Sequence, residues 1–131
     1  MIAMKFTALV TLAAVVQTFL LSARVGAARG KLGIEAPATS GKPEFDKAFR
    51  IHMNTVEQLV LFIPMLWLAA RVIGDVWAPA VGAIWIVGRV VYASGYRNDI
   101  AKRGPGMLMT VFSTAVLAAI TVWGITQSFM A

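Results

Sequence analysis

The stretch MLMTVFSTAVLAAITVWGITQSF, residues 107–129, contains no charged side chain. A helix needs about 20 mostly apolar residues to cross the hydrocarbon core of a bilayer, and this stretch is long enough. Residues 6–23, FTALVTLAAVVQTFLLSA, have the same character, with Gln17 as the one strongly polar side chain. Both stretches predict helices that lie in lipid.

The composition of the whole chain agrees with this prediction. Of the 131 residues, 59 % are hydrophobic and 14 % are charged, and the mean hydropathy is +0.75. A soluble domain typically carries about 25 % charged residues, so this chain has too few to cover a surface that faces water. The composition excludes a soluble enzyme domain, a disordered chain and a collagen-like chain. The absence of cysteine excludes disulfides and thiolate metal sites.

Four apolar segments predict an all-α integral membrane protein, a four-transmembrane-helix bundle in which residues 1–131 form a single domain. Residues 24–47 are rich in glycine and proline and are predicted to be a loop. Glu44 and Asp46 suit the N-terminus of the next helix, in which Pro64 is a candidate position for a kink. The predicted spans cover about residues 5–24, 46–73, 77–97 and 106–129.

The first apolar segment has an alternative interpretation as a secretory signal peptide. Lys5 precedes it, and Gly26-Ala27-Ala28 has the small residues of a cleavage site. However, the segment is longer than the usual apolar core of about 7–15 residues, and it ends directly in Arg24. These two features favour a helix that is retained.

Positively charged residues are concentrated on one side of the predicted bundle, whereas the other side holds only Lys5 and Arg71. By the positive-inside rule, this asymmetry predicts that both termini lie away from the cytoplasm. The loops account for the net charge of +6, and no aromatic-basic repeat accompanies it, so nucleic acid is not an expected partner. The loop cations are Arg24, Arg29, Lys31, Lys42, Lys47, Arg97, Lys102 and Arg103.

Polar side chains at membrane depth are costly and usually face protein or a wet cavity. At about 100° per residue, Asn54 and Glu57 lie within about 40° of Arg50 around a helix. These three side chains therefore form one stripe, which presents a cation, an amide and a carboxylate. Such a stripe can bind a zwitterion. Alternatively, Glu57 can form an ion pair with Arg50 or Arg89 that fixes the packing of the helices.

A second stripe is predicted on the third span. Tyr92 and Tyr96 lie within about 60° of Arg89, and Arg103 would continue the stripe if the helix extended through Ala101. Arginine binds carboxylates at two points, and tyrosine offers a hydroxyl on a flat apolar face. A structural alternative places both tyrosines in an interfacial aromatic belt. No metal is expected, because the single histidine, His52, has no second histidine or cysteine beside it.

The stretch Arg50-Ile51-His52-Met53-Asn54-Thr55-Val56-Glu57 resembles the signature of the MAPEG family, the membrane-associated proteins in eicosanoid and glutathione metabolism. The block Gly88-Arg89-Val90-Val91-Tyr92-Ala93-Ser94-Gly95-Tyr96, followed by Arg103, is similar to the third-helix pattern of that family. Ser22-Ala23-Arg24 and Pro43-Glu44-Phe45 are similar too. The resemblance covers about residues 20–105 in register.

The resemblance implies a homotrimer of four-helix subunits in the lipid bilayer, with glutathione as co-substrate and a lipophilic small molecule as second substrate. It implies a glutathione site between neighbouring subunits, near the cytoplasmic face. Val25 stands where the leukotriene-forming branch has an arginine, and Gln58 stands where a tyrosine often follows the signature glutamate. The chain therefore looks like a bacterial-type member of the inner membrane. The residues carried over to the site are Arg50, Asn54, Glu57, Arg89, Tyr92, Tyr96 and Arg103, with Arg24 from the adjacent chain.

The expected activity is that of a glutathione transferase or peroxidase acting on lipophilic electrophiles or hydroperoxides. A cation held close to the glutathione thiol favours the reactive thiolate, and Arg103 is the expected catalytic residue, with Arg24 as the alternative. Two other functions stay open. One is a four-span proton-coupled drug exporter, although residues 5–24 contain no acid where such exporters place a glutamate. The other is a non-catalytic membrane protein that retains the scaffold.

Overall fold

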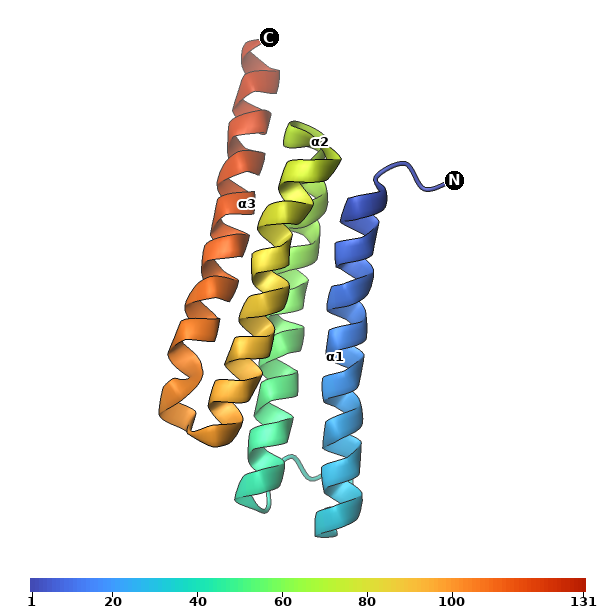
Figure 1. Cartoon of the computed structure of the whole chain (residues 1–131), viewed down its shortest axis with the longest axis vertical. Helices are drawn as coiled ribbons and strands as arrows, with labels where there is room; N and C mark the ends of the chain where they lie inside the picture. Colours follow the sequence, from blue (N-terminus) through green and yellow to red (C-terminus); the bar gives the residue numbers. More distant parts are fainter.

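The computed structural model describes residues 1–131 and is all-α (Figure 1). Three long helices carry apolar windows that are long enough to cross a membrane. A short 3-10 helix precedes the last of them. The elements are α1 (Lys5–Leu32), α2 (Pro43–Asn98), η1 (Ile100–Arg103) and α3 (Gly104–Met130).

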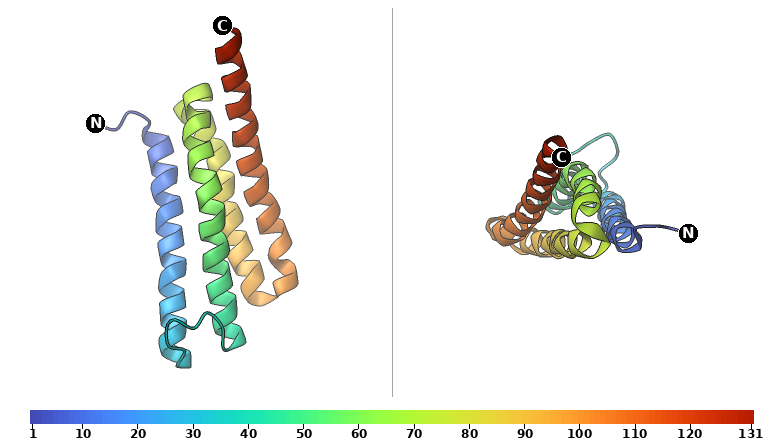
Figure 2. Two further views of the ribbon diagram at one scale, coloured as in Figure 1. Left: turned by 180° about the vertical axis from the view of Figure 1, so that it is seen from behind. Right: turned by 90° about the horizontal axis from the view of Figure 1, so that it is seen from above.

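The predicted spans 46–73 and 77–97 both belong to α2, whose path reverses at Gly74 (Figures 1 and 2). Gly74 has φ 90° and ψ 171°, a backbone conformation that is essentially restricted to glycine. We call residues 43–73 the first arm of α2 and residues 75–98 its second arm. The arms pack on each other, and the rings of Phe62 and Trp85 stack with their centroids 4.5 Å apart. The backbone stays helical through Pro64.

The prediction of a loop from residue 24 is wrong, because α1 continues to Leu32. It ends at Gly33, which is left-handed at φ 67° and donates its N–H to the carbonyl of Arg29. Helix-interior glycines such as Gly26 and Gly30 cost about 1 kcal/mol each relative to alanine, which is too little to stop this helix. The connection therefore shortens to residues 33–42.

The core lies where α2 meets its two neighbours. Figure 2 shows α2 between α1 and α3, and α1 has no backbone contact with α3. Ala14 of α1, Leu66 of the first arm, Trp85 of the second arm and Leu117 of α3 are fully buried together. Outside this core, large apolar side chains such as Phe19 (70 % exposed) cover the surface. So much exposed apolar surface is stable in lipid and marks an integral membrane protein.

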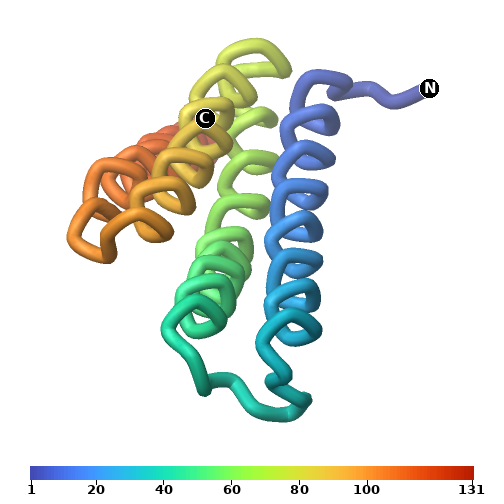
Figure 3. Tube along the Cα trace, turned by 60° about the horizontal axis from the view of Figure 1, so that its bottom comes forward, coloured from blue at the N-terminus to red at the C-terminus, as the bar shows by residue number.

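Asp75 ties the turn of α2 to the beginning of α1, the end shown uppermost in Figure 3. Its carboxylate accepts hydrogen bonds from the backbone N–H groups of Phe6 (3.0 Å) and Thr7 (2.8 Å) and from the Thr7 hydroxyl (2.8 Å). Desolvation acts to raise the pKa of Asp75, but these hydrogen bonds and the charge of Lys5 outweigh it and lower the pKa. A carboxylate thus caps the N-terminus of a helix distant in sequence.

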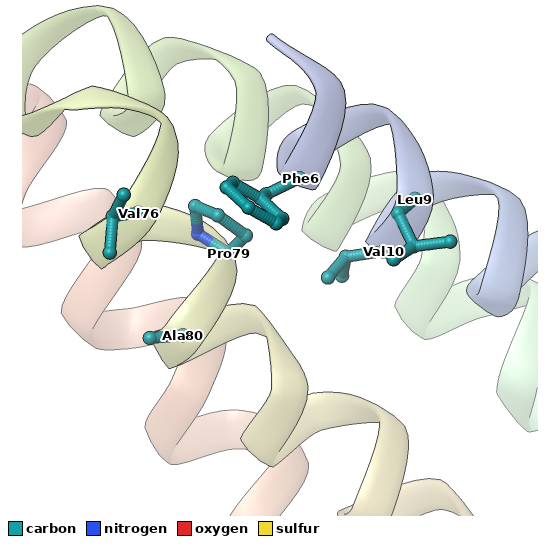
Figure 4. A pocket seen from close by; sticks show the side chains of 6 residues that line it. All are labelled: Phe6, Leu9, Val10, Val76, Pro79 and Ala80. Atoms are coloured by element: carbon teal, nitrogen blue, oxygen red, sulfur yellow. The ribbon is translucent and has the colours of Figure 1, made fainter.

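An apolar hollow of about 250 Å³ lies beside the hydrogen bonds of Asp75 (Figure 4). It is at the end of the molecule opposite the predicted polar stripes and has no polar side chain. It is therefore a lipid-facing depression and offers no chemistry of its own. Its walls come from α1 and the second arm: Phe6, Leu9, Val10, Val76, Pro79 and Ala80.

Candidate functional site

The first polar stripe lies near the beginning of the first arm of α2. Arg50 and Glu57 form an ion pair of 3.1 Å between Nη1 and Oε1, with a second contact of 3.5 Å between Nη2 and Oε2. Asn54 donates from Nδ2 to Glu57 Oε2 at 3.4 Å. The helical spacing therefore places the three side chains on one face, and Arg50 is the partner that Glu57 takes.

Arg89 of the second arm is fully buried and has no carboxylate partner. Its Nη2 donates to Asn54 Oδ1 and to Thr55 Oγ1, both at 2.9 Å. Its guanidinium carbon lies 4.1 Å from the centre of the Tyr92 ring, and its Nη1 lies 3.9 Å from Met107 Sδ. Arg89 thus joins the two predicted stripes, which lie on facing arms of α2.

Asn54 is the link between these groups. Its amide oxygen accepts from Arg89 while its amide nitrogen donates to Glu57, which in turn holds Arg50. The orientation of the amide is fixed by these opposite requirements, since a guanidinium only donates and a carboxylate only accepts. Through Asn54 and Glu57, these contacts therefore connect the buried Arg89 to the half-exposed Arg50.

A hollow of about 410 Å³ opens beside this network. It lies among the first arm, the second arm, η1 and the beginning of α3, and Tyr92 and Tyr96 form one wall with ring centroids 5.6 Å apart. Two guanidinium groups and one amide face the same space. The lining residues are Arg50, Asn54, Tyr92, Tyr96, Arg103 and Met107.

Arg103 reaches this hollow by a route different from the predicted one. The second arm ends at Asn98, Asp99 is extended, and Arg103 is the last residue of η1, so the helix does not extend through Ala101. Close packing brings η1 to the second arm. A Cβ at Gly95 would collide with the carbonyl oxygen of Lys102, and a Cβ at Gly106 would collide with the backbone nitrogen of Tyr92.

The remaining predicted site residues lie outside the lining of this hollow. Glu57 stands behind Arg50, and Arg89 is buried behind Asn54. Arg24 lies on α1 and lines other hollows, together with Arg97. Within one chain, therefore, Arg24 is separate from the group around Arg50 and Arg103.

Two residues of the network were not predicted. Thr55 supplies a hydroxyl to Arg89, and Met107 lines the hollow. Thr55 directly follows Asn54 in the sequence, and a buried arginine without a carboxylate needs neutral acceptors. That requirement is the one feature of the sequence that could have pointed to Thr55, whereas nothing in the sequence points to Met107.

The fold and the hollow define an all-α membrane protein with a cationic, tyrosine-lined site at one end of its helices. The chain matches the model of the MAPEG family over residues 7–123, and it belongs to that family. An uncharacterized protein of Synechocystis is 39 % identical over 110 residues, which are 84 % of this chain and 80 % of that protein.

Human microsomal glutathione S-transferase 2 is 36 % identical over 107 residues, which are 82 % of this chain and 73 % of that enzyme. Bovine leukotriene C4 synthase is 28 % identical over 121 residues, or 92 % of this chain and 81 % of that enzyme. The resemblance inferred from the sequence motifs is thus confirmed. These relatives support a glutathione-related function in a membrane.

Proposed function

We propose that the protein binds glutathione in the hollow between the arms of α2 and uses its thiol on lipophilic electrophiles or hydroperoxides. The observation that carries this proposal is the joint lining of one hollow by Arg50 and Asn54 of the first arm and Arg103 of η1. The name of one relative, microsomal glutathione S-transferase 2, supports the choice of ligand.

The charges of the hollow match those of glutathione, which has two carboxylates and one ammonium group. Arg50, together with Arg24 of the adjacent chain, is suited to the carboxylates, since a guanidinium can bind a carboxylate at two points. Glu57 is the nearest carboxylate for the ammonium group and is half-exposed beside Arg50. Arg89 has the separate task of orienting Asn54. Tyr92 and Tyr96 provide a flat wall with hydroxyl groups.

The proposed assembly is a homotrimer in the bacterial inner membrane. Each chain crosses the bilayer four times, with α2 contributing both of its arms, and both termini face away from the cytoplasm. Arg24, which lies outside the hollow of its own chain, completes the site of the adjacent chain. This arrangement gives a role to each residue carried over from the family resemblance.

In the proposed mechanism, Arg103 stabilises the thiolate of bound glutathione and the thiol proton leaves to solvent. The thiolate then attacks an apolar electrophile that enters from the lipid. With a chloronitrobenzene, a carbon–sulfur bond forms and chloride leaves with the electron pair of the carbon–chlorine bond. With a hydroperoxide, two glutathione molecules are oxidised to the disulfide while the hydroperoxide is reduced to an alcohol and water.

Glutathione titration of the detergent-purified protein tests the binding step. Arg50→Ala is expected to weaken binding by roughly 10- to 100-fold, the range for loss of a hydrogen bond to a charged group. Arg71→Ala, which removes an exposed cation far from the hollow, is the matched control and should bind like the wild type. Equal affinities in the wild type and Arg50→Ala would contradict the proposed site.

Turnover tests the chemical step in the same preparations. Arg103→Ala is expected to lower the rate with a chloronitrobenzene and with a lipid hydroperoxide while glutathione still saturates the protein. Equal rates in the two proteins would remove Arg103 from the mechanism. Binding without turnover in the wild type would instead identify a non-catalytic member of the family.

A further inference from the structure

A second polar groove runs between α1 and the second arm of α2, with the beginning of the first arm lining its outer part, and it is separate from the hollow described above. It consists of an inner part of about 190 Å³ and an outer part of about 430 Å³, and both parts are lined by Arg24 and Arg97. Arg89 also lines the inner part, and Lys47 lines the outer part. No residue of this groove other than Arg24 and Arg89 belongs to the proposed glutathione site.

The groove carries positive charge that the chain does not neutralise. Its one acid, Glu44, is already paired with Lys31 at 3.0 Å. Arg24, Arg89 and Arg97 form no ion pair, since the second and last salt bridge of the chain joins Arg50 to Glu57. The ligand that fits must therefore bring an anion.

The inner part combines polar side chains with apolar ones, and two of the apolar side chains face the lipid. Leu20 is 56 % exposed and Val90 is 58 % exposed, so both offer surface to acyl chains. Arg24 follows Leu20 by four residues, or about 6 Å along the helix, and Arg97 follows Val90 by seven, or about 10 Å. The groove thus changes from apolar to cationic over the distance that separates acyl chains from headgroups.

We propose that this groove binds an acidic phospholipid, with the headgroup phosphate beside Arg97 and Lys47 and an acyl chain along Leu20 and Val90. Basic pockets between membrane helices at the cytoplasmic side are suited to anionic headgroups. This inference depends on the membrane location of the chain and is independent of glutathione binding. Since Arg24 also has a role in the proposed trimer, Arg97 is the residue to test.

Native mass spectrometry of the detergent-purified full chain tests this proposal. The protein is mixed with equal amounts of palmitoyl-oleoyl phosphatidylglycerol and palmitoyl-oleoyl phosphatidylcholine. We expect preferential retention of phosphatidylglycerol by the wild type, and about fivefold weaker retention by Arg97→Gln, as expected for one cation near an anionic headgroup. Arg71→Gln, with the same change in net charge at the far end, should retain the lipid like the wild type.

Three results would overturn the proposal. They are equal retention of the two lipids, equal losses in Arg97→Gln and Arg71→Gln, and displacement of phosphatidylglycerol by an equal concentration of inorganic phosphate, which would identify a site for free phosphate. If Arg97→Gln does not fold, Lys47→Gln takes its place and should lose retention in the same direction. Glutathione affinity of Arg97→Gln should be unchanged, so a failure of this proposal is distinguishable from a failure of the proposed function.

Discussion

Thr55 helps to hold the buried Arg89, which has no counter-ion. Its hydroxyl donates to the carbonyl of Ile51 at 2.8 Å and accepts from Arg89 at 2.9 Å. Thr110 is the natural comparison, because it is equally buried and its hydroxyl donates to the carbonyl of Gly106 at 2.8 Å, but it accepts from no cation. The two threonines therefore differ in the bond to Arg89 alone.

Thr55→Val should cost roughly 1–3 kcal/mol of stability, because it leaves a buried guanidinium donor with one acceptor fewer. Thr110→Val removes a hydroxyl with the same helix contact and should be close to neutral. Thermal denaturation of both variants in the same detergent measures the difference. Equal losses in the two variants would mean that the bond between Thr55 and Arg89 contributes nothing.

Asp75 makes stability depend on pH. The pKa of Asp75 is lowered in the folded chain from its ordinary 3.8, so ionisation of this group favours the folded state. Its contribution is complete above the ordinary pKa and is lost as the pH falls below 3.8 and through the lowered value. We therefore expect wild-type stability to approach that of Asp75→Asn as the solution is acidified.

Unfolding curves of both proteins at several pH values between about 6 and about 3 test this expectation. The difference between wild type and Asp75→Asn should be largest at the upper end and shrink towards the lower end. Glu35→Gln is the control, because Glu35 is exposed and has no side-chain hydrogen bond. A difference that stays constant over this range would contradict the assignment to Asp75.

At this scale, the sequence predicts contacts along a helix better than contacts across helices. The spacing of Arg50, Asn54 and Glu57 is sufficient to place them on one face, because helical geometry is regular. The bond from Thr55 to Arg89 depends on how far one arm of α2 slides along the other. That register is set by packing around pairs such as Phe62 and Trp85. The spacing of residues within one helix does not predict this packing.

Among the elements, α3 depends on a close approach to the second arm of α2. A Cβ at Gly106 would collide with the backbone of Tyr92, which no side-chain rotation can relieve. Gly106→Ala should therefore destabilise the protein by roughly 1–3 kcal/mol or more, since α3 must move away. It should also weaken glutathione binding, because the same contact positions η1 and Arg103.

Gly104 provides the matched control for this prediction. It lies two residues earlier, is helical, and has open space where a Cβ would stand. Gly104→Ala should be neutral or stabilising by up to about 1 kcal/mol, the helix preference of alanine over glycine. Thermal denaturation and glutathione titration of both variants separate the effect of crowding from that of losing a glycine. Similar behaviour of the two variants would contradict this account.

The ends of the helices were predicted unevenly. Glu44 and Asp46 placed the beginning of α2 within a few residues, because acids are typical of a first turn. The end of α1 was placed eight residues too early, at 24 instead of Leu32. Apolar character ends where the hydrocarbon ends, whereas a helix continues into water until a residue such as Gly33 terminates it.

For the whole molecule, the proposed trimer makes a prediction that no single chain can satisfy. If Arg24 acts on the site of the adjacent chain, Arg24→Ala and Arg50→Ala each disable every site of their own homotrimer. In a mixed ring of the two variants, one chain can supply Arg50 and its neighbour can supply Arg24. Co-expression in equal amounts should restore about one quarter of the glutathione sites, as random assortment in a closed ring requires.

Isothermal titration of the co-expressed and affinity-separated mixture measures this recovery. The control is a mixture of the two variants made after separate purification, without exchange of subunits. This mixture should recover no glutathione binding. If the co-expressed mixture also shows no recovery, Arg24 and Arg50 serve the same site within one chain, and the shared site is disproved. Recovery of every glutathione site would also contradict this account, because a mixed trimer can contain only one site that has both Arg50 and Arg24.

Composition was sufficient to predict the environment of the whole molecule, because too few charges are present to cover it in water. The sequence also predicted the change of direction: the predicted spans 46–73 and 77–97 are the two arms of α2, and the helical backbone is interrupted between them at Gly74. Gly74 and Asp75 were identified as a turn, but sequence spacing gives no sign that Asp75 would reach Phe6 and Thr7.

The contact of Asp75 with Phe6 and Thr7 has a consequence for the time at which the chain can complete its fold. The first helix leaves the ribosome long before its capping carboxylate, which follows Thr7 by 68 residues. A nascent chain that has emerged only as far as Ile73 lacks the acceptor for the N–H groups of Phe6 and Thr7. The two ends can thus be joined only after the first helical hairpin has been synthesised, so Asp75 acts as a latch that cannot close before that point.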